Sequence, residues 1–114
     1  MWSIDICEEL ETELEDFSEV IIKKLFARID LLVIHGPHLS RPYSDTLEES
    51  KLNNLKELRF NADGGVWRFA YAFDPKRKGI VLIGADKSGK NQKQFYKTLI
   101  KKAEERYEKY LATY

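Results

Sequence analysis

One segment of the chain constrains the fold most, because it holds three strand-like runs separated by two short turns. These runs are residues 55–61, 66–73 and 80–83. Between the first two runs stands Ala62-Asp63-Gly64-Gly65, a sequence typical of a hairpin turn. Aromatic side chains occupy every second position of the middle run, which places them on one face of a strand. They are Trp67, Phe69, Tyr71 and Phe73. The segment therefore predicts an antiparallel meander.

The residues before this meander predict one strand and two helices. Residues 2–6 alternate apolar and polar side chains, as in a half-buried strand. Residues 8–16 predict a short acidic helix, and a second helix begins after the N-cap residue Ser18. Apolar residues then recur at helical spacing until Gly36-Pro37 ends the helix. They are Ile22, Leu25, Phe26, Ile29, Leu32 and Val33. We expect the two helices to form a hairpin on the sheet.

The residues after the meander predict a long terminal helix. Residues 91–111 carry an apolar stripe made of Phe95, Leu99, Ala103 and Tyr107. The order β-α-α-β-β-β-α indicates one α+β domain over residues 1–114. We expect a small, twisted, mainly antiparallel sheet with the first strand at an edge and the helices on one face. The connection 37–54 is long for such a domain, so it either has a function or is held by its side chains.

The net charge of zero hides a division between the two halves of the chain. Residues 1–50 hold twelve acidic and four basic side chains, whereas residues 51–114 hold seven acidic and fifteen basic ones. Six lysines and no acid occur between Lys87 and Lys102. This asymmetry points to a polyanionic partner such as a nucleic acid. A solvated, lysine-rich helix face is the alternative explanation.

Several classes of protein are disfavoured by what the sequence lacks. No apolar run reaches the ~18 residues that cross a membrane, and the first residues lack the features of a secretion signal. The single cysteine, Cys7, cannot form an internal disulfide, and one cysteine with two histidines is a poor zinc-ligand set. We expect a cytoplasmic protein without a metal, another cofactor or a membrane partner.

A near match to a phosphate-binding loop precedes the last helix. Residues 84–90 fit the pattern G-x-x-x-x-G-K, but Asn91 replaces the hydroxyl residue that holds magnesium, and the meander lacks parallel βαβ units. A glycine-containing connection is the simpler interpretation. Lys87 and Lys90 nevertheless bring positive charge to a helix N-terminus, where a phosphate is favoured.

The hairpin turn brings two arginines together. With a four-residue turn at 62–65, Arg59 lies opposite Arg68 on the neighbouring strand. Like charges in that position are destabilising unless an anion, or a carboxylate such as that of Glu57, lies between them. A simple salt bridge between Glu57 and Arg68 is one interpretation. Because Lys87 arrives from the end of the third strand, we favour an anion site.

His35 and His38 flank the end of the second helix. A histidine pair can act as acid and base in RNA cleavage. Cationic side chains are also favoured at a helix C-terminus, and we prefer that role. Tyr71 and Tyr96 each fit either a packed ring or a polar contact to a base.

A series of short motifs runs in order through nearly the whole chain. They are Gly36-Pro37-His38-Leu39-Ser40-Arg41-Pro42, Asp45-Thr46-Leu47, Asn54-Leu55-Lys56-Glu57-Leu58-Arg59, Trp67-Arg68, Tyr71-Ala72-Phe73-Asp74-Pro75, Val81-Leu82, Asp86-Lys87, Phe95-Tyr96 and Ala103-Glu104. Each motif alone is weak, but the ordered set resembles the RelE/ParE toxin superfamily, in particular its HigB-like, phage-derived branch. The resemblance implies the same α+β fold.

The resemblance also implies the toxin of a type II toxin–antitoxin system. RelE and HigB toxins enter the ribosomal A site and cleave mRNA there without a metal, by attack of a 2′-hydroxyl on the adjacent phosphodiester. That chemistry needs one group to take the 2′ proton, one to protonate the 5′ oxygen, and cations on the phosphate. The implied partners are an antitoxin protein, the ribosome and mRNA.

Candidate site residues follow from the matching motifs. Arg68, Lys87 and Tyr96 match the family's strand arginine, its basic residue after the last strand and its helix tyrosine. Glu57 stands where RelE has a lysine, so it is either the proton acceptor or a partner of Arg68. The catalytic candidates are thus Glu57, Arg68, Lys87 and Tyr96, and the candidate RNA or phosphate ligands are Lys56, Arg59, Lys90 and Lys93.

Two other functions fit the same resemblance. A ParE-like member would inhibit DNA gyrase without catalysis, although ParE proteins lack this cluster of side chains. A degenerate member would bind only its antitoxin.

Overall fold

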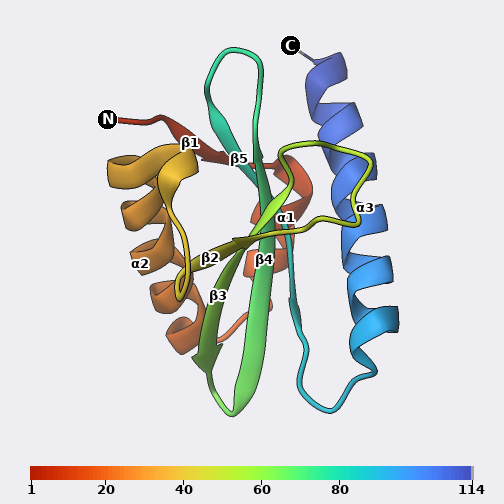
Figure 1. Cartoon of the computed structure of the whole chain (residues 1–114). Coiled ribbons are helices and arrows are strands. Elements are labelled where there is room, and N and C mark those ends of the chain that lie inside the picture. Colours follow the sequence, from red (N-terminus) through yellow and green to blue (C-terminus); the bar gives the residue numbers. More distant parts are fainter. Residues whose placement is uncertain (114) are drawn as a thin grey trace.

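A computed structural model describes residues 1–113 as one five-stranded sheet with three α-helices and a short 3-10 helix, η1 (Figure 1). Along the chain these are β1 (Ile4–Ile6), α1 (Glu8–Leu14), α2 (Glu19–His35), η1 (Gly36–His38), β2 (Ser44–Thr46), β3 (Lys56–Ala62), β4 (Gly65–Phe73), β5 (Gly79–Asp86) and α3 (Gln92–Ala112). The α+β class and the order are confirmed, with β2 as an additional strand. No helix within residues 1–113 has the length and apolar character of a membrane span.

The sheet has the order β1-β5-β4-β3-β2, and β1–β5 is its parallel pair. β3, β4 and β5 form the antiparallel meander predicted from the turn residues, and β1 lies at an edge as expected. Ala62 pairs with Gly65, so Arg59 lies opposite Arg68, and the predicted register is confirmed. The sequence does not predict β2, because its three residues show no apolar alternation. Its backbone pairing with β3 identifies it as a strand.

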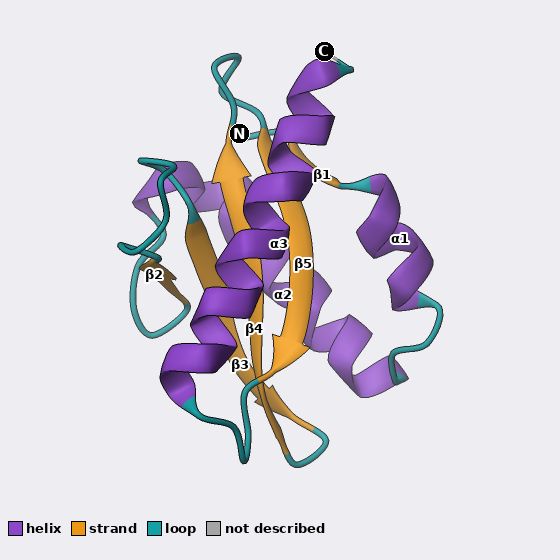
Figure 2. Ribbon diagram, turned by 90° about the vertical axis from the view of Figure 1, so that its right-hand side faces the viewer, coloured by secondary structure: helices purple, strands orange, loops and turns teal. Residues whose placement is uncertain are grey.

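The helices cover both faces of the sheet. α2 lies against one face, while α1 and α3 lie against the other (Figure 1 and Figure 2). The expectation that all helices share one face is therefore wrong, because β4 carries buried apolar residues on both faces. Its aromatic face meets α2, where Phe69 stacks on Phe60 and Arg28 lies over the Phe60 ring. Ala70 and Ala72 are fully buried on the opposite face, which allows α3 to approach closely.

Both long helices begin after a capping residue, and Ser18 is the cap that the sequence predicts. Ser18 accepts a hydrogen bond from the Ile21 N–H at the start of α2, and Asn91 caps α3 in the same way. The buried stripe of α2 is Ile21, Leu25, Ile29 and Leu32. Phe26, which the spacing placed in that stripe, is 45% exposed. α3 buries all four residues of its predicted stripe, Phe95, Leu99, Ala103 and Tyr107.

Candidate functional site

A groove with a volume of about 840 Å³ lies between β3 and the first turns of α3. β3 contributes Glu57 and Arg59, the loop after β5 contributes Lys87, and α3 contributes Lys93 and Tyr96. Five of the eight side chains proposed from the sequence therefore meet in this groove.

Arg68 lies beneath the groove and shares the carboxylate of Glu57 with Arg59. The Arg59 Nη1 atom is 2.8 Å from Glu57 Oε2, and the Arg68 Nε atom is 3.7 Å from Glu57 Oε1. The exposed fractions of the side chains are 3% for Glu57, 7% for Arg68 and 21% for Arg59. The three residues form a compact, largely buried charge cluster with one more cation than anion.

Two atoms of this cluster have no hydrogen-bond partner within residues 1–113. They are Glu57 Oε1 and Arg68 Nε. The 3.7 Å that separates them is too long for a hydrogen bond. A buried polar atom without a partner costs about 1–3 kcal/mol, and such atoms commonly meet a water, an ion or a substrate. The cluster is therefore suited to bind an anion or to accept a proton.

Lys87 and Tyr96 lie next to this cluster. The Lys87 Nζ atom is 5.6 Å from the centroid of the Tyr96 ring. Burial lowers the pKa of Lys87, and the positive charges of Arg68 and Arg59 lower it further. Burial raises the pKa of the Tyr96 phenol, and the Glu57 carboxylate adds to this effect. Tyr96 therefore keeps its proton at neutral pH, whereas Lys87 is a stronger acid than an ordinary lysine.

Lys56 and Lys90 do not join the groove. The Lys56 ammonium donates to the carbonyl oxygens of Pro37 and Leu39, at 2.9 and 3.0 Å. It lies on the α2 face of the sheet, because alternation separates it from the groove-facing residues of β3. Lys90 lines a separate cavity of about 650 Å³ between α1 and α3, and its Nζ atom lies 5.9 Å from the centroid of the Phe95 ring.

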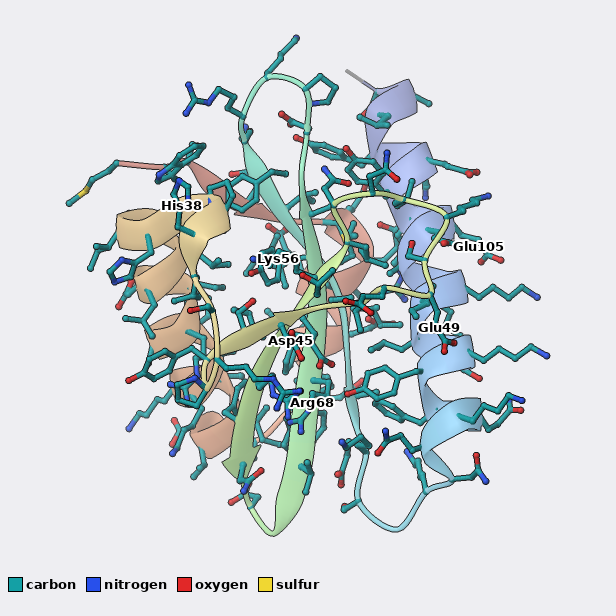
Figure 3. The ribbon with its side chains drawn as sticks, in the orientation of Figure 1. His38, Asp45, Glu49, Lys56, Arg68 and Glu105 are labelled. Atoms are coloured by element: carbon teal, nitrogen blue, oxygen red, sulfur yellow. The ribbon has the colours of Figure 1, made fainter. Side chains whose placement is uncertain are left out.

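The two histidines also lie away from the groove. His35 is in the last turn of α2, where a cation suits the helix end, and His38 is the last residue of η1. Figure 3 shows His38 next to α2, on the opposite side of the sheet from α3. No group of three potential metal-ligating side chains is present in the described part of the chain, residues 1–113.

The other wall of the groove comes from the long connection 37–54. This wall contains Arg41, Asp45, Glu48 and Glu49. Arg41 Nη2 lies 2.7 Å from Asp45 Oδ2, and this contact lowers the pKa of the Asp45 carboxyl. Asp45 lies on the edge strand β2, where it pairs with Glu57 of β3. Figure 3 shows Glu49 beside α3. In the sequence, this connection stands out by its length and by the motifs that contain Arg41 and Asp45.

The groove therefore differs from a uniformly basic patch. Its four cations are Arg41, Arg59, Lys87 and Lys93, and its four carboxylates are Asp45, Glu48, Glu49 and Glu57. Three of the cations lie on the β3 and α3 side, whereas three of the carboxylates lie on the connection together with Arg41. Such a division suits a ligand that carries negative charge at one end and hydrogen-bond donors at the other.

Comparison with known proteins identifies one family model and two relatives that match most of this chain. Residues 12–108 match the family model described as "Phage derived protein Gp49-like". "Putative toxin HigB3" of Mycobacterium tuberculosis (strain ATCC 25618 / H37Rv) is 45% identical over 85 residues, which cover 75% of this chain and 72% of that protein. "Putative toxin HigB2" of the same strain is 34% identical over 114 residues, which cover 99% of this chain and 56% of that protein. This chain thus spans little more than half of the second relative. No solved structure matches.

Proposed function

This chain belongs to the family of phage-derived Gp49-like proteins, and on that basis we propose that it is the toxin of a type II toxin–antitoxin system. Two relatives with the printed names "Putative toxin HigB3" and "Putative toxin HigB2" support this proposal. We further propose that it is a ribosome-dependent endoribonuclease that cuts mRNA in the A site and so inhibits translation. Its partners are then a cognate antitoxin protein, the ribosome and mRNA.

One observation carries the nuclease proposal. Side chains from three separate elements and a loop meet at one end of the groove, namely Glu57, Arg59, Arg68, Lys87 and Tyr96. Three of them are cations and one is a carboxylate, so this end is positively charged although the groove as a whole is balanced. A phosphodiester is favoured at such a place, and the same cations stabilise the extra charge of its transition state.

The reaction is a transesterification within the RNA. The 2′-oxygen of one nucleotide bonds to the adjacent phosphorus, and the bond from that phosphorus to the 5′-oxygen of the next nucleotide breaks. Glu57 takes the 2′ proton at Oε1, the oxygen without a hydrogen-bond partner within residues 1–113. Arg59 and Arg68 hold the phosphate oxygens on which charge develops. The products are a 2′,3′-cyclic phosphate and a free 5′-hydroxyl.

The departing 5′-oxygen needs a proton, and Lys87 supplies it in this mechanism. The lowered pKa of Lys87 makes its ammonium a better acid. The raised pKa of Tyr96 keeps its phenol protonated, so the hydroxyl positions the phosphate as a hydrogen-bond donor.

A function without catalysis has one observation in its favour. The Glu57 carboxylate already occupies the space between the two guanidinium groups, and an RNA phosphate has to compete with it. A member that only binds its antitoxin, or one that inhibits DNA gyrase, tolerates this arrangement because it needs no phosphate there.

A reconstituted translation reaction separates these functions. Purified protein is added, and the ends of the message are mapped with and without ribosomes. The nuclease gives cuts in the A-site codon that require ribosomes and leave a 2′,3′-cyclic phosphate. Intact message at every protein concentration refutes it. A supercoiling assay with DNA gyrase then distinguishes a gyrase inhibitor from a protein that only binds its antitoxin.

A further inference from the structure

The acidic wall of the groove has the wrong charge for binding a phosphate. Its carboxylates are those of Asp45, Glu48 and Glu49. Carboxylates repel an RNA backbone, so they weaken binding unless they contact another part of the nucleotide. Arg41 neutralises Asp45. Glu48 and Glu49 are left as the carboxylates of this wall without an ion pair in the described residues 1–113.

The side chains of Glu48 and Glu49 are exposed, and the chain on both sides of them is held in place. Before them, Leu47 is 6% exposed, and its N–H donates to the carbonyl of Leu55 at 2.9 Å. After them, the Ser50 hydroxyl and the Lys51 N–H both donate to Glu104 Oε2 of α3, at 2.7 and 2.9 Å. The backbone of the wall is thereby anchored to the sheet and to α3, which keeps Glu48 and Glu49 at the rim of the groove.

The floor of the same groove independently points to a ligand. Glu57 lines the groove, its side chain is 3% exposed, and Oε1 has no hydrogen-bond partner within residues 1–113. The volume of about 840 Å³ lies within the range of ~300–1,000 Å³ that is usual for small-molecule sites. A nucleotide whose phosphate reaches the floor therefore has room to extend its base toward the acidic wall.

Carboxylates at this place have a definite preference among bases, because they only accept hydrogen bonds. Cytosine, adenine and guanine carry exocyclic amino groups, whereas uracil flanks its one N–H with two carbonyl oxygens. We propose that Glu48 and Glu49 select, next to the cut phosphate, a base with an exocyclic amino group and reject uracil. This inference rests on the proposed ribonuclease function of the groove.

Cytosine and uracil give the sharpest test, since they have the same size and differ at position 4 of the ring. Messages that differ only by C or U in the A-site codon are presented on stalled ribosomes, and the ratio of cleavage rates is measured. A charge-assisted hydrogen bond predicts a C-to-U ratio of about ten for the wild type. The ratio falls to about one in E48A/E49A and is inverted in E48K/E49K, because an ammonium donates to the uracil carbonyl.

The matched control is Glu105→Ala, which removes an exposed carboxylate of α3 outside the groove (Figure 3). It is expected to keep the wild-type ratio. A ratio of one in the wild type, or a ratio that E48A/E49A leaves unchanged, overturns base selection while the nuclease function stands.

A binding measurement distinguishes failure of the nuclease proposal from failure of base selection. Short C-rich and U-rich oligoribonucleotides are titrated against the purified wild-type protein and E48A/E49A without ribosomes. If no message is cut but the double variant abolishes tighter binding of the C-rich RNA, the nuclease proposal fails and base selection stands. Equal affinities together with uncut message refute both.

Discussion

Arg59 lies directly across the β3–β4 ladder from Arg68, and the carboxylate of Glu57 lies between their guanidinium groups. Like charges in such a cross-strand pair destabilise a sheet, so the carboxylate offsets their repulsion. In the proposed function, the same carboxylate competes with RNA phosphate for the two arginines. The Glu57 carboxylate therefore stabilises the fold but weakens the binding of phosphate to the two arginines.

The first prediction concerns this counter-ion. Glu57→Gln keeps the shape of the side chain but removes its charge. We expect a loss of about 3 kcal/mol in the free energy of unfolding, because two largely buried guanidinium groups lose their carboxylate. Urea denaturation measures the loss, and Glu105→Gln reports the effect of removing an exposed carboxylate. Sulfate is expected to stabilise E57Q more than the wild type, since an anion can then bind between the arginines. Unchanged stability contradicts the counter-ion role.

The second prediction compares two lysines three positions apart. Lys87→Ala is expected to lower the cleavage rate by about 10²-fold or more, because it removes the proton donor and a charge that stabilises the transition state. Lys90→Ala removes the same charge from the same loop, but outside the groove, and is expected to leave the rate unchanged. Single-turnover cleavage on ribosomes measures both. Equal losses in the two variants would show that only the overall charge of the loop matters.

The third prediction concerns pH. Because the mechanism needs protonated Lys87, the cleavage rate falls as pH rises through the pKa of that group, which burial places below the usual lysine value. The decline therefore begins at a lower pH than an ordinary lysine would give. Lys87→Arg cleaves more slowly, but its decline is absent up to higher pH, because a guanidinium stays protonated. A decline at the same pH in both proteins rules out Lys87 as its source.

The fourth prediction concerns the attachment of β2, which carries Asp45 into the groove wall. The buried hydroxyl groups of Ser44 and Tyr71 form a hydrogen bond, and burial raises the pKa of Tyr71 to about 12. Tyr71→Phe is expected to cost about 1–3 kcal/mol of stability, because it leaves the Ser44 hydroxyl without its partner. The double variant with Ser44→Ala is expected to lose less than the sum of the two single losses. Additive losses in urea denaturation contradict this coupling.

The β3–β4 hairpin shows how much of the site is encoded locally. Strand alternation puts Glu57 and Arg59 on one face, and the turn length sets Arg59 against Arg68. Lys56 and Arg59 are three positions apart, so the same alternation puts their side chains on opposite faces of β3. It places Lys56 on the α2 face, where its ammonium binds the Pro37 and Leu39 carbonyls. The strand period by itself thus places Lys56 on the face opposite Glu57 and Arg59.

The sequence by itself determined the meander, the register of its first hairpin and the starts of the long helices. Side-chain periods, turn residues and caps act over a few neighbouring positions, so they can be read locally. Only the tertiary structure decided which face each helix covers and that the connection 37–54 forms an acidic wall. The conformation of that connection depends on contacts between distant residues, such as those of Ser50 and Lys51 with Glu104. The spacing of side chains along a helix or strand does not predict such long-range contacts. The charge balance of the groove depends on them, because they hold the acidic connection at the groove.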